Sequence, residues 1–269
     1  MAVLNMTPDS FSDGGKFSSL DGAVAAALQM ERAGADILDI GGESTRPGSS
    51  ATPAAEELAR ILPLIEALRR RLKIPISVDT RKASVAEIAL GAGAEIVNDV
   101  SGLRYDPALA VVTARQRAPL ILMHMRGIPR TMQEKPFAKD VLRDVREGLR
   151  ESVSVARKAG VAKSQIVLDP GIGFGKSYRQ NYELIARLAE LEKLGYPLLV
   201  GTSRKGFIGA TLARDGMPRP PAERIWGTAA TVAASILNGA HIVRVHDVAE
   251  MVQVARVTDC VLDSRNSSH

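Results

Sequence analysis

The chain has 269 residues, of which 45% are hydrophobic and 24% are charged. This length suits one domain with a full core, and its apolar runs are too short to span a membrane. Lys and Arg outnumber Asp and Glu by 35 to 30, which gives a formal net charge of +5. The cations are scattered and aromatic residues make up only 4% of the chain, which argues against a nucleic-acid partner. An anionic small-molecule substrate explains the charge as well, so we expect neither a nucleic-acid nor a membrane partner.

The cysteine content bears on the compartment. The single cysteine, Cys260, cannot form a disulfide within the chain, which is consistent with a reducing environment. The first residues show no charged segment followed by an apolar stretch, the pattern of a secretory signal. We therefore expect a cytoplasmic protein.

Short apolar runs alternate with helical stretches along the chain. The predicted strands are 2–4, 37–40, 76–78, 96–97, 120–123, 166–168, 198–200 and 242–245. The predicted helices are 20–33, 53–72, 83–92, 107–115, 139–159, 178–194, 223–238 and 248–261. Nearly continuous apolar strands are typical of a parallel sheet that is buried on both faces. Eight strand–helix units with short returns predict an α/β protein with a single (β/α)8 TIM barrel over residues 1–263, followed by a disordered tail at 264–269.

The first predicted strand is shorter than expected. It begins directly after Met1 and ends before Asn5, whereas about five residues are usual for a strand. Either this strand is short, or the chain has lost residues that once preceded it.

Polar residues follow every predicted strand, at the end where a TIM barrel carries its active site. These segments are 5–15, 41–48, 79–81, 98–102, 123–127, 169–176, 201–206 and 244–246. The last two place cationic and hydroxyl side chains just past a strand, where an anionic group such as phosphate binds. The alternating glycines at 171–175 resemble a phosphate-cradling loop, but they can equally mark a tight turn that needs positive φ.

Three buried polar residues end three different strands. Asp79, Asn98 and Asp169 would converge on the barrel mouth, where two carboxylates and an amide suit a flat heterocycle edged with amine and lactam groups, such as a pterin or guanine. Any one of the carboxylates could instead cap the following helix or pair with an arginine. Three such residues together favour the binding site.

Other chemistries find less support in the sequence. Lys205 could act as a Schiff-base nucleophile, although a hydrogen-bonding role is simpler. No Ser/His/Asp set resembles a hydrolytic triad, and His124 and His246 lie on different strands without zinc-like spacing.

Eight motifs combine along nearly the whole chain. They are LNMTPDSFSDGG at 4–15, DIGGESTRPG at 39–48, SVDT at 77–80, ND at 98–99, LMHM at 122–125, LDPGIGFGK at 168–176, GTSRK at 201–205 and RVH at 244–246. Together they are highly specific, and the chain resembles the dihydropteroate synthase family of folate biosynthesis. Members of that family carry a longer segment before the position of Asn5, which forms barrel-floor structure and the full first strand.

The resemblance implies an enzyme that transfers an alkyl group. It would join 7,8-dihydropterin-6-ylmethyl diphosphate to 4-aminobenzoate and release 7,8-dihydropteroate and pyrophosphate. The resemblance also implies Mg²⁺ as a cofactor, sulfonamides as inhibitors, and a homodimer formed through the later helices. The small, apolar stretch 229–237 could serve in that dimer or could equally pack on the barrel.

The resemblance assigns roles to individual residues. The pterin would be held by Asp79, Asn98, Asp169, Lys205 and Met123. The diphosphate would be held by Asn5, Arg244 and His246, with the metal on Asn5. The aminobenzoate would be surrounded by Thr45, Arg46, Pro47, Phe174, Ser203 and Phe11. The residues expected to act in catalysis are Asp79, Lys205, Asp13 and Arg46, and the first two loops are expected to close over the site.

The chemistry predicted from these residues is a dissociative substitution, in which pyrophosphate leaves before the amine attacks. Its charge would be neutralised by Arg244, His246 and Mg²⁺, and Asp79 and Asp13 would stabilise the cation left at the pterin methylene. Two alternatives remain at this point. One is a pterin-binding methyltransferase domain, which has no need of the Ser-Arg-Lys segment. The other is a catalytically degenerate pterin-binding paralogue.

Overall fold

Eight parallel strands alternate with helices in the part of the chain that the computed structural model describes, residues 1–6, 19–44, 48–128, 131–132 and 138–266. The strands are β1 (Ala2–Asn5), β2 (Leu38–Gly41), β3 (Ile76–Asp79), β4 (Ile96–Asp99), β5 (Leu120–Met123), β6 (Ile166–Asp169), β7 (Leu199–Val200) and β8 (Ile242–Val243). β1 has four residues, the same length as each strand from β2 to β6.

Hydrogen bonds close these strands into a barrel. β1 to β6 pair in sequence order, and β7 pairs with β8. The bridge Leu168↔Leu198 joins β6 to β7, and the bridge Ala2↔Val245 joins the end of β8 to β1. The N-terminal amine of Met1 also donates to the carbonyl oxygen of Val243 at 2.9 Å. The predicted (β/α)8 barrel is therefore confirmed.

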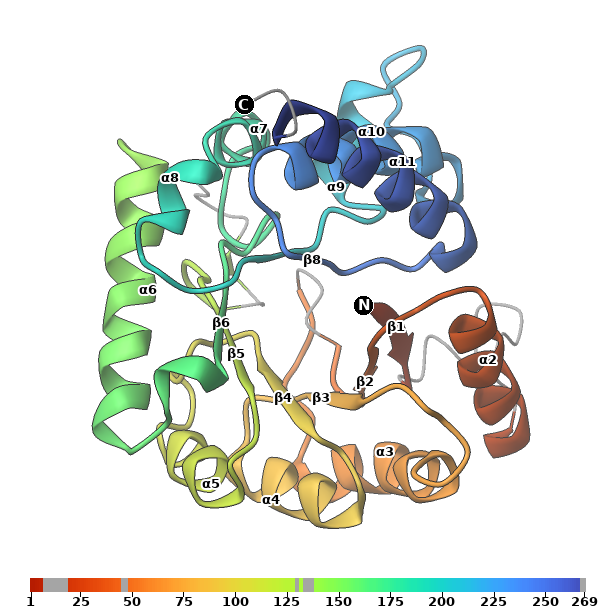
Figure 1. The fold of residues 1–269 in the computed structure, drawn as a ribbon, viewed down its shortest axis with the longest axis vertical. Helices are drawn as coiled ribbons and strands as arrows, with labels where there is room; N and C mark the ends of the chain where they lie inside the picture. The colour runs from red at the N-terminus through yellow and green to blue at the C-terminus, as the bar shows by residue number, and fades with distance from the viewer. Residues whose placement is uncertain (7–18, 45–47, 129–130, 133–137, 267–269) are drawn as a thin grey trace.

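Helices surround the strands (Figure 1). They are α2 (Leu20–Arg32), α3 (Ala54–Leu68), α4 (Ala83–Ala92), α5 (Ala108–Gln116), α6 (Val141–Lys158), α7 (Tyr178–Ala186), α8 (Ala189–Glu192), α9 (Gly206–Thr211), α10 (Ile225–Leu237) and α11 (Val248–Asn266), with 3-10 turns at Lys163–Gln165 and Pro221–Glu223. In Figure 1, α3, α4 and α5 lie along one side of the ring and α9, α10 and α11 along the opposite side.

Several helices differ from the predicted bounds by one or two residues, and α3 ends at Leu68, four residues before its predicted end. Three other differences are larger. The predicted helix 178–194 is divided into α7 and α8, with a break around Arg187. The sequence did not predict α9, in which Gly206 and Gly209 lower the intrinsic helix propensity. α11 runs to Asn266 and so extends three residues into the segment predicted to be a tail.

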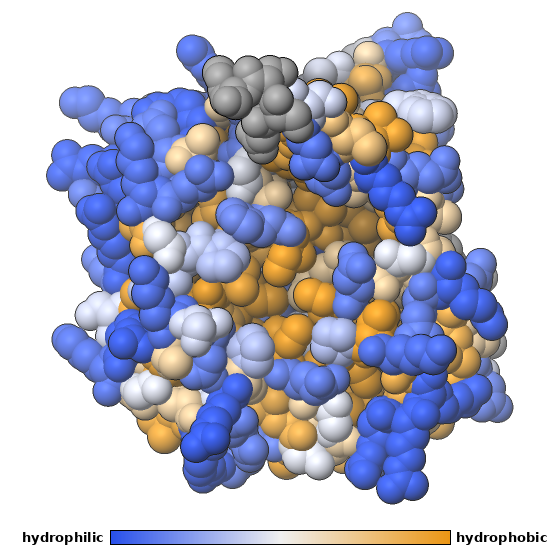
Figure 2. All heavy atoms as spheres, viewed as in Figure 1, coloured by the Kyte–Doolittle hydropathy of each residue, from blue (hydrophilic) through white to orange (hydrophobic). Residues whose placement is uncertain are grey.

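The core has two main layers. The larger lies between the strands and the helices and includes Leu38, Ile61, Leu109 and Leu184, each fully buried. A smaller cluster of Met1, Ile96, Ile121 and Leu199 lies at or next to the starts of β1, β4, β5 and β7. Figure 2 shows apolar side chains gathered in a hollow within the ring of helices, with hydrophilic side chains around it. None of the helices described is both long and apolar enough to cross a membrane.

The turn that follows β6 contains glycines with positive φ at 171, 173 and 175. Gly171 has φ of +68°, and a Cβ there would lie 1.9 Å from the backbone oxygen of His124. Only glycine fits this position, because the obstacle is a main-chain carbonyl that cannot rotate away. The turn after β6 is thereby pressed against the end of β5.

Candidate active site

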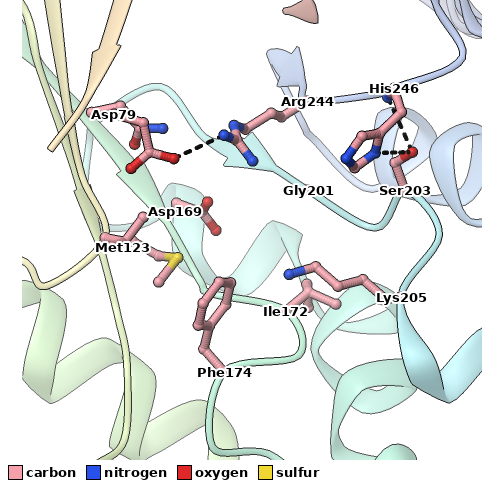
Figure 3. A pocket seen from close by; sticks show the side chains of 12 residues that line it. Asp79, Met123, Asp169, Ile172, Phe174, Gly201, Ser203, Lys205, Arg244 and His246 are labelled. Atoms are coloured by element: carbon pink, nitrogen blue, oxygen red, sulfur yellow. Dashed lines mark hydrogen bonds and ion pairs between the residues drawn. The ribbon is translucent and has the colours of Figure 1, made fainter. Parts of the chain in front are cut away.

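One pocket opens at the carboxyl ends of the strands (Figure 3). It is lined by Asp79, Asn98, Val100, Met123, Asp169, Ile172, Phe174, Gly201, Ser203, Lys205, Arg244 and His246. Nine of these residues were predicted from the sequence, and they come from β3 to β8 or from the segments that follow these strands. The apolar members Val100 and Ile172 were not predicted, because an apolar residue after a strand cannot be told from core.

The remaining predicted residues fall into two groups. Asn5 ends β1 and lies beside Gly41, but it is not among the residues that line the pocket. The other five lie outside the described residues: Phe11, Asp13, Thr45, Arg46 and Pro47.

The two pocket carboxylates have partners within the protein. Asp79 accepts a hydrogen bond from Nη2 of Arg244 at 2.9 Å, and Asp169 accepts one from the backbone N–H of Gly171 at 2.6 Å. Burial raises the pKa of Asp79 to about 8, against the opposing effect of Arg244. Burial likewise raises the pKa of Asp169. The alternative role of arginine pairing is thus realised in Asp79, which also faces the pocket. Asp169 bonds to the turn after β6 and does not cap the following helix, since the N-cap of α7 is Ser177.

Arg244 is shared between two carboxylates. Its Nε donates to Oδ2 of Asp39 at 2.7 Å, while Nη2 donates to Asp79. Burial alone would lower the pKa of Arg244, but Asp39 and Asp79 outweigh burial and raise it. The guanidinium is therefore a fixed positive charge at the pocket wall.

Asp39 is a site component that sequence reasoning did not assign. It lies within β2, is fully buried, and accepts a second hydrogen bond from Nδ2 of Asn98 at 3.1 Å. The available signal was a carboxylate inside an otherwise apolar strand, since a buried charge needs a partner.

Lys205 reaches into the pocket from the residue that precedes α9 (Figure 3). Its ammonium nitrogen lies 4.0 Å from the centre of the Phe174 ring, a cation–π contact. Burial, reinforced by Arg244, lowers the pKa of Lys205 to about 8. At neutral pH the side chain remains mainly an ammonium with donors for a ligand.

His246 and Ser203 form a pair on the wall made by the segments after β7 and β8. The backbone N–H of His246 donates to Oγ of Ser203 at 3.2 Å, and Nδ1 lies 3.0 Å from the same oxygen. Burial, followed by the charge of Arg244, lowers the pKa of His246 to about 3. The imidazole is therefore neutral at neutral pH, so it offers hydrogen bonds but does not supply the positive charge that was expected of it.

The neighbouring Arg204 has a structural role. Its Nε donates to Oδ2 of Asp247 at 3.0 Å, and its carbonyl oxygen accepts from Arg224 at 2.7 Å. The bond to Asp247 ties the segment after β7 to the one after β8, and the bond from Arg224 ties it to the start of α10. They keep the segment that carries Ser203 and Lys205 beside the one that carries Arg244 and His246.

A buried pair, Lys176 and His124, anchors the end of the glycine-rich turn after β6. Nζ of Lys176 donates to Nδ1 and to the backbone oxygen of His124, both at 2.9 Å. Lys176 is only 2% exposed, and burial lowers its pKa to about 7. The pair joins the residue after β5 to the end of the turn that carries Ile172 and Phe174, and the sequence gave no hint of it.

A charged cluster lies at the base of the segment after β2. Glu43 accepts hydrogen bonds from Arg81 at 2.8 Å, from Lys82 at 2.7 Å and from the backbone N–H of Thr52 at 3.0 Å. Burial alone would raise the pKa of Glu43, but Arg81 and Lys82 outweigh burial and lower it. The carboxylate thus joins both ends of the segment 44–52 to the segment after β3.

The residues described contain no group of three or more His, Cys, Asp or Glu side chains placed to hold a metal. Asn5 offers an amide oxygen at the end of β1, where a Cβ on Gly41 would come within 3.3 Å of it. The absence of a side chain at Gly41 leaves room beside this oxygen. One oxygen ligand fits Mg²⁺, which is commonly bound by one or two protein groups together with substrate phosphates.

Comparisons with known proteins agree with this geometry. Residues 1–246 match the family model described as "Pterin binding enzyme". A dihydropteroate synthase from Synechocystis sp. is 51% identical over 261 residues, which cover 97% of this chain and 89% of that protein. A crystal structure of the Yersinia pestis dihydropteroate synthase with a sulfonamide drug has a TM-score of 0.92 and 42% identity, and the match covers 98% and 94% of the two chains. The Xanthomonas albilineans dihydropteroate synthase in complex with 7,8-dihydropteroate has a TM-score of 0.86 and 41% identity, over 97% and 92%.

The match over residues 1–246 places the barrel and its pocket among the pterin-binding enzymes. At 51% identity over nearly the whole length, the chain belongs to the dihydropteroate synthase family. The resemblance predicted from the motifs is confirmed, and these relatives favour it over a pterin-binding methyltransferase.

The burial of Lys205 predicts a pH-dependent stability difference. Because its folded-state pKa of about 8 lies below the ordinary value of 10.5, the unfolded chain binds more protons between these values. The free energy of unfolding of the wild type therefore rises with pH in this window. We expect Lys205→Met to be more stable than the wild type at about pH 7, by on the order of 1–3 kcal/mol, and this advantage to shrink towards about pH 10.

Urea unfolding at both pH values measures the difference. Lys193→Met, at an exposed position, is the matched control and should show no such trend. A wild type that is the more stable protein at about pH 7 would contradict the effect of burial on Lys205.

Proposed function

We propose that this protein condenses 7,8-dihydropterin-6-ylmethyl diphosphate with 4-aminobenzoate to form 7,8-dihydropteroate and pyrophosphate. The observation that carries the proposal is one pocket in which nine residues predicted from the sequence meet. Relatives at 51% and 41% identity are named as dihydropteroate synthases, and one of them was crystallised with 7,8-dihydropteroate.

The pterin ring suits the acceptor-rich end of the pocket. Asp79, Asn98 and Asp169 offer oxygen atoms to the ring's amine and N–H groups, and Lys205 offers donors to its ring acceptors. Met123 is 2% exposed and supplies an apolar, polarizable surface for the ring face. A pocket of convergent polar groups with apolar walls is typical of a small-molecule site.

The diphosphate suits the cationic wall formed by Arg244, with His246 as a neutral hydrogen-bond donor. Mg²⁺ bound at Asn5 would supply further charge neutralisation for the leaving pyrophosphate. Removal of divalent ions with EDTA is therefore expected to stop turnover and to leave the fold intact, as circular dichroism would show.

The aminobenzoate suits the side of the pocket that Phe174 and Ser203 line. Thr45, Arg46, Pro47 and Phe11, predicted for the same subsite, lie outside the described residues. Sulfonamides are expected to compete at this subsite, in line with the sulfonamide complex of the Yersinia pestis relative.

A homodimer is part of the proposal. Much of the stretch 229–237 packs inside the subunit, since Thr231, Val232 and Ser235 of α10 are buried. Exposed apolar side chains remain on α10 and α11, among them Trp226 at 81% and Val257 at 67%. Exposed apolar patches of this kind favour contact with another protein surface.

We also retain the proposal of a cytoplasmic location. It is supported by the single cysteine, Cys260, which is free and exposed on α11. Fractionation of the source cells checks it.

The activity is tested by a coupled pyrophosphate-release assay with both substrates and Mg²⁺. We expect Asp169→Asn and Lys205→Ala each to lower kcat/KM by about 10- to 100-fold, since each removes a charged hydrogen-bonding partner. Asp21→Asn and Lys193→Ala, at exposed positions, are the matched controls. A folded wild type that binds the pterin without turnover would instead indicate a degenerate paralogue, and unchanged rates in both site variants would remove these residues from the site.

The order of bond breaking is tested by omitting one substrate. A dissociative reaction forms the pterin methylene cation before the amine attacks, so pyrophosphate should be released when aminobenzoate is absent. The Asp13→Asn variant should release less, because Asp13 is proposed to stabilise that cation. A wild type that releases pyrophosphate only when aminobenzoate is present would argue for a concerted reaction.

The dimer is tested by sedimentation velocity. The double variant V257K/V261K places two charges on the exposed face of α11, so we expect it to sediment as a monomer while the wild type sediments as a dimer. V111K, at an exposed apolar position on α5, is the control and should remain dimeric. A double variant that stays dimeric would place the interface elsewhere.

A further inference from the structure

Asp39 lies beneath the pocket and contacts two of the residues that line its wall. It is fully buried and is not one of the residues lining the pocket, so it cannot touch a ligand there. Its Oδ2 accepts from Asn98 at 3.1 Å and from Nε of Arg244 at 2.7 Å. Any effect it has on a ligand must therefore pass through Asn98 or Arg244.

The contact with Asn98 fixes which end of its amide faces the pocket. The carboxylate of Asp39, paired with Arg244, offers only acceptors, so Asn98 must present its NH₂ group to it. The carbonyl Oδ1 of Asn98 is then the end left for a ligand. An asparagine without such a partner could rotate its amide by half a turn and offer a donor instead.

The contact with Arg244 is made to the edge of the guanidinium that carries Nε and Nη2. Oδ2 of Asp39 lies 2.7 Å from both Nε and Nη2, and Nη2 also reaches Asp79 in the pocket wall at 2.9 Å. A ligand that donates hydrogen bonds to Asp79 competes with Nη2 for this carboxylate. The bond from Nε to Asp39 can persist during that exchange and keep the guanidinium beside the pocket.

We propose that Asp39 is a positioning residue which sets the specificity of the pocket, by fixing Asn98 as a hydrogen-bond acceptor and holding the Nε edge of the Arg244 guanidinium. The ligand class it selects is a heterocycle with a donor edge, such as the 2-amino group and ring N–H of a pterin. This inference rests on the proposed function, because it names the ligand edge that Asn98 meets.

The test compares two ligands that differ along one edge of the ring. The first is 7,8-dihydropterin, and the second is its analogue with a 2-oxo group in place of the 2-amino group. This exchange turns the exocyclic donor into an acceptor and places a proton on the adjacent ring nitrogen. Isothermal titration calorimetry measures the dissociation constant of each for the wild type and for Asp39→Asn. We expect the wild type to bind the 2-amino ligand more tightly by more than about tenfold. The carbonyl oxygen of Asn98 can accept a hydrogen bond from the 2-amino group but cannot bond to a 2-oxo oxygen.

In Asp39→Asn the neutral side chain can donate to or accept from Asn98, so both orientations of the Asn98 amide become available. We expect the preference for the 2-amino ligand to fall by at least about tenfold, with the 2-oxo ligand gaining relative to it. The matched control is Ser77→Ala, at the position on β3 that pairs with Asp39 and is equally buried. It removes a polar atom from the same layer and should leave the preference unchanged.

The outcomes separate this inference from the proposed function. A wild type that binds neither ligand overturns the proposed function. A wild type that prefers the 2-amino ligand, with the same preference in Asp39→Asn, overturns the role of Asp39 alone. An equal loss of preference in Ser77→Ala would also overturn it, because general loosening of the barrel would then explain the effect.

A second variant serves if Asp39→Asn does not fold. In Asn98→Ser the hydroxyl can donate to Asp39 and keep its oxygen as an acceptor towards the pocket. We expect this variant to bind more weakly but to retain the preference for the 2-amino ligand, whereas Asn98→Val should lose it. Loss of the preference in Asn98→Ser would show that Asp39 does not determine the hydrogen-bonding direction at this position.

Discussion

The pairing of the residues just past β8 with β1 is the constraint on which the pocket depends. Val3 donates its backbone N–H to Val245 at 3.0 Å, and Val245 donates to Met1 at 2.9 Å. Val3 is also the register partner of Asp39 on β2. Because Arg244 and His246 flank Val245, closing the barrel brings the last strand's cation to a carboxylate on the second strand. The ion pair between Arg244 and Asp39 joins residues 205 positions apart in the chain.

The pocket concentrates charges that burial disfavours. One guanidinium serves both Asp39 and Asp79, and burial shifts the pKa values of Asp79, Asp169 and Lys205 towards their neutral forms. Such an arrangement does little for stability, since desolvation offsets much of the attraction between buried charges. Its benefit lies in preorganisation, because the fixed dipoles and charges need not reorient when a ligand's own charge develops. His246 does not add a further positive charge beside Arg244. Burial and the charge of Arg244 lower the pKa of His246, so its imidazole stays neutral.

The sequence predicted the architecture because each strand ends in a polar motif and each is short and apolar. It could predict the pocket residues for the same reason, since Asp79, Asn98 and Asp169 mark the last residues or the ends of β3, β4 and β6. It could not predict the hydrogen bonds between strands that are distant in sequence. The role of Asp39 depends on Asn98 and Arg244, and that of Lys176 on a histidine 52 residues away. It also missed α9, because packing overrides the weak helix propensity of a segment with two glycines.

The strand β2 connects two parts of the site through residues on either side of its end. Asp39, inside the barrel, accepts hydrogen bonds from Asn98 and Arg244. Glu43, just past the strand, joins both ends of the segment 44–52 to Arg81 and Lys82. The segment 44–52 contains three of the six residues proposed for the aminobenzoate, and Asn98 and Arg244 are among those proposed for the pterin and its diphosphate. A shift of β2 along its register would therefore displace both subsites together. In the proposed assignment, residues anchored to one strand thus support both substrates, which must meet at one carbon atom.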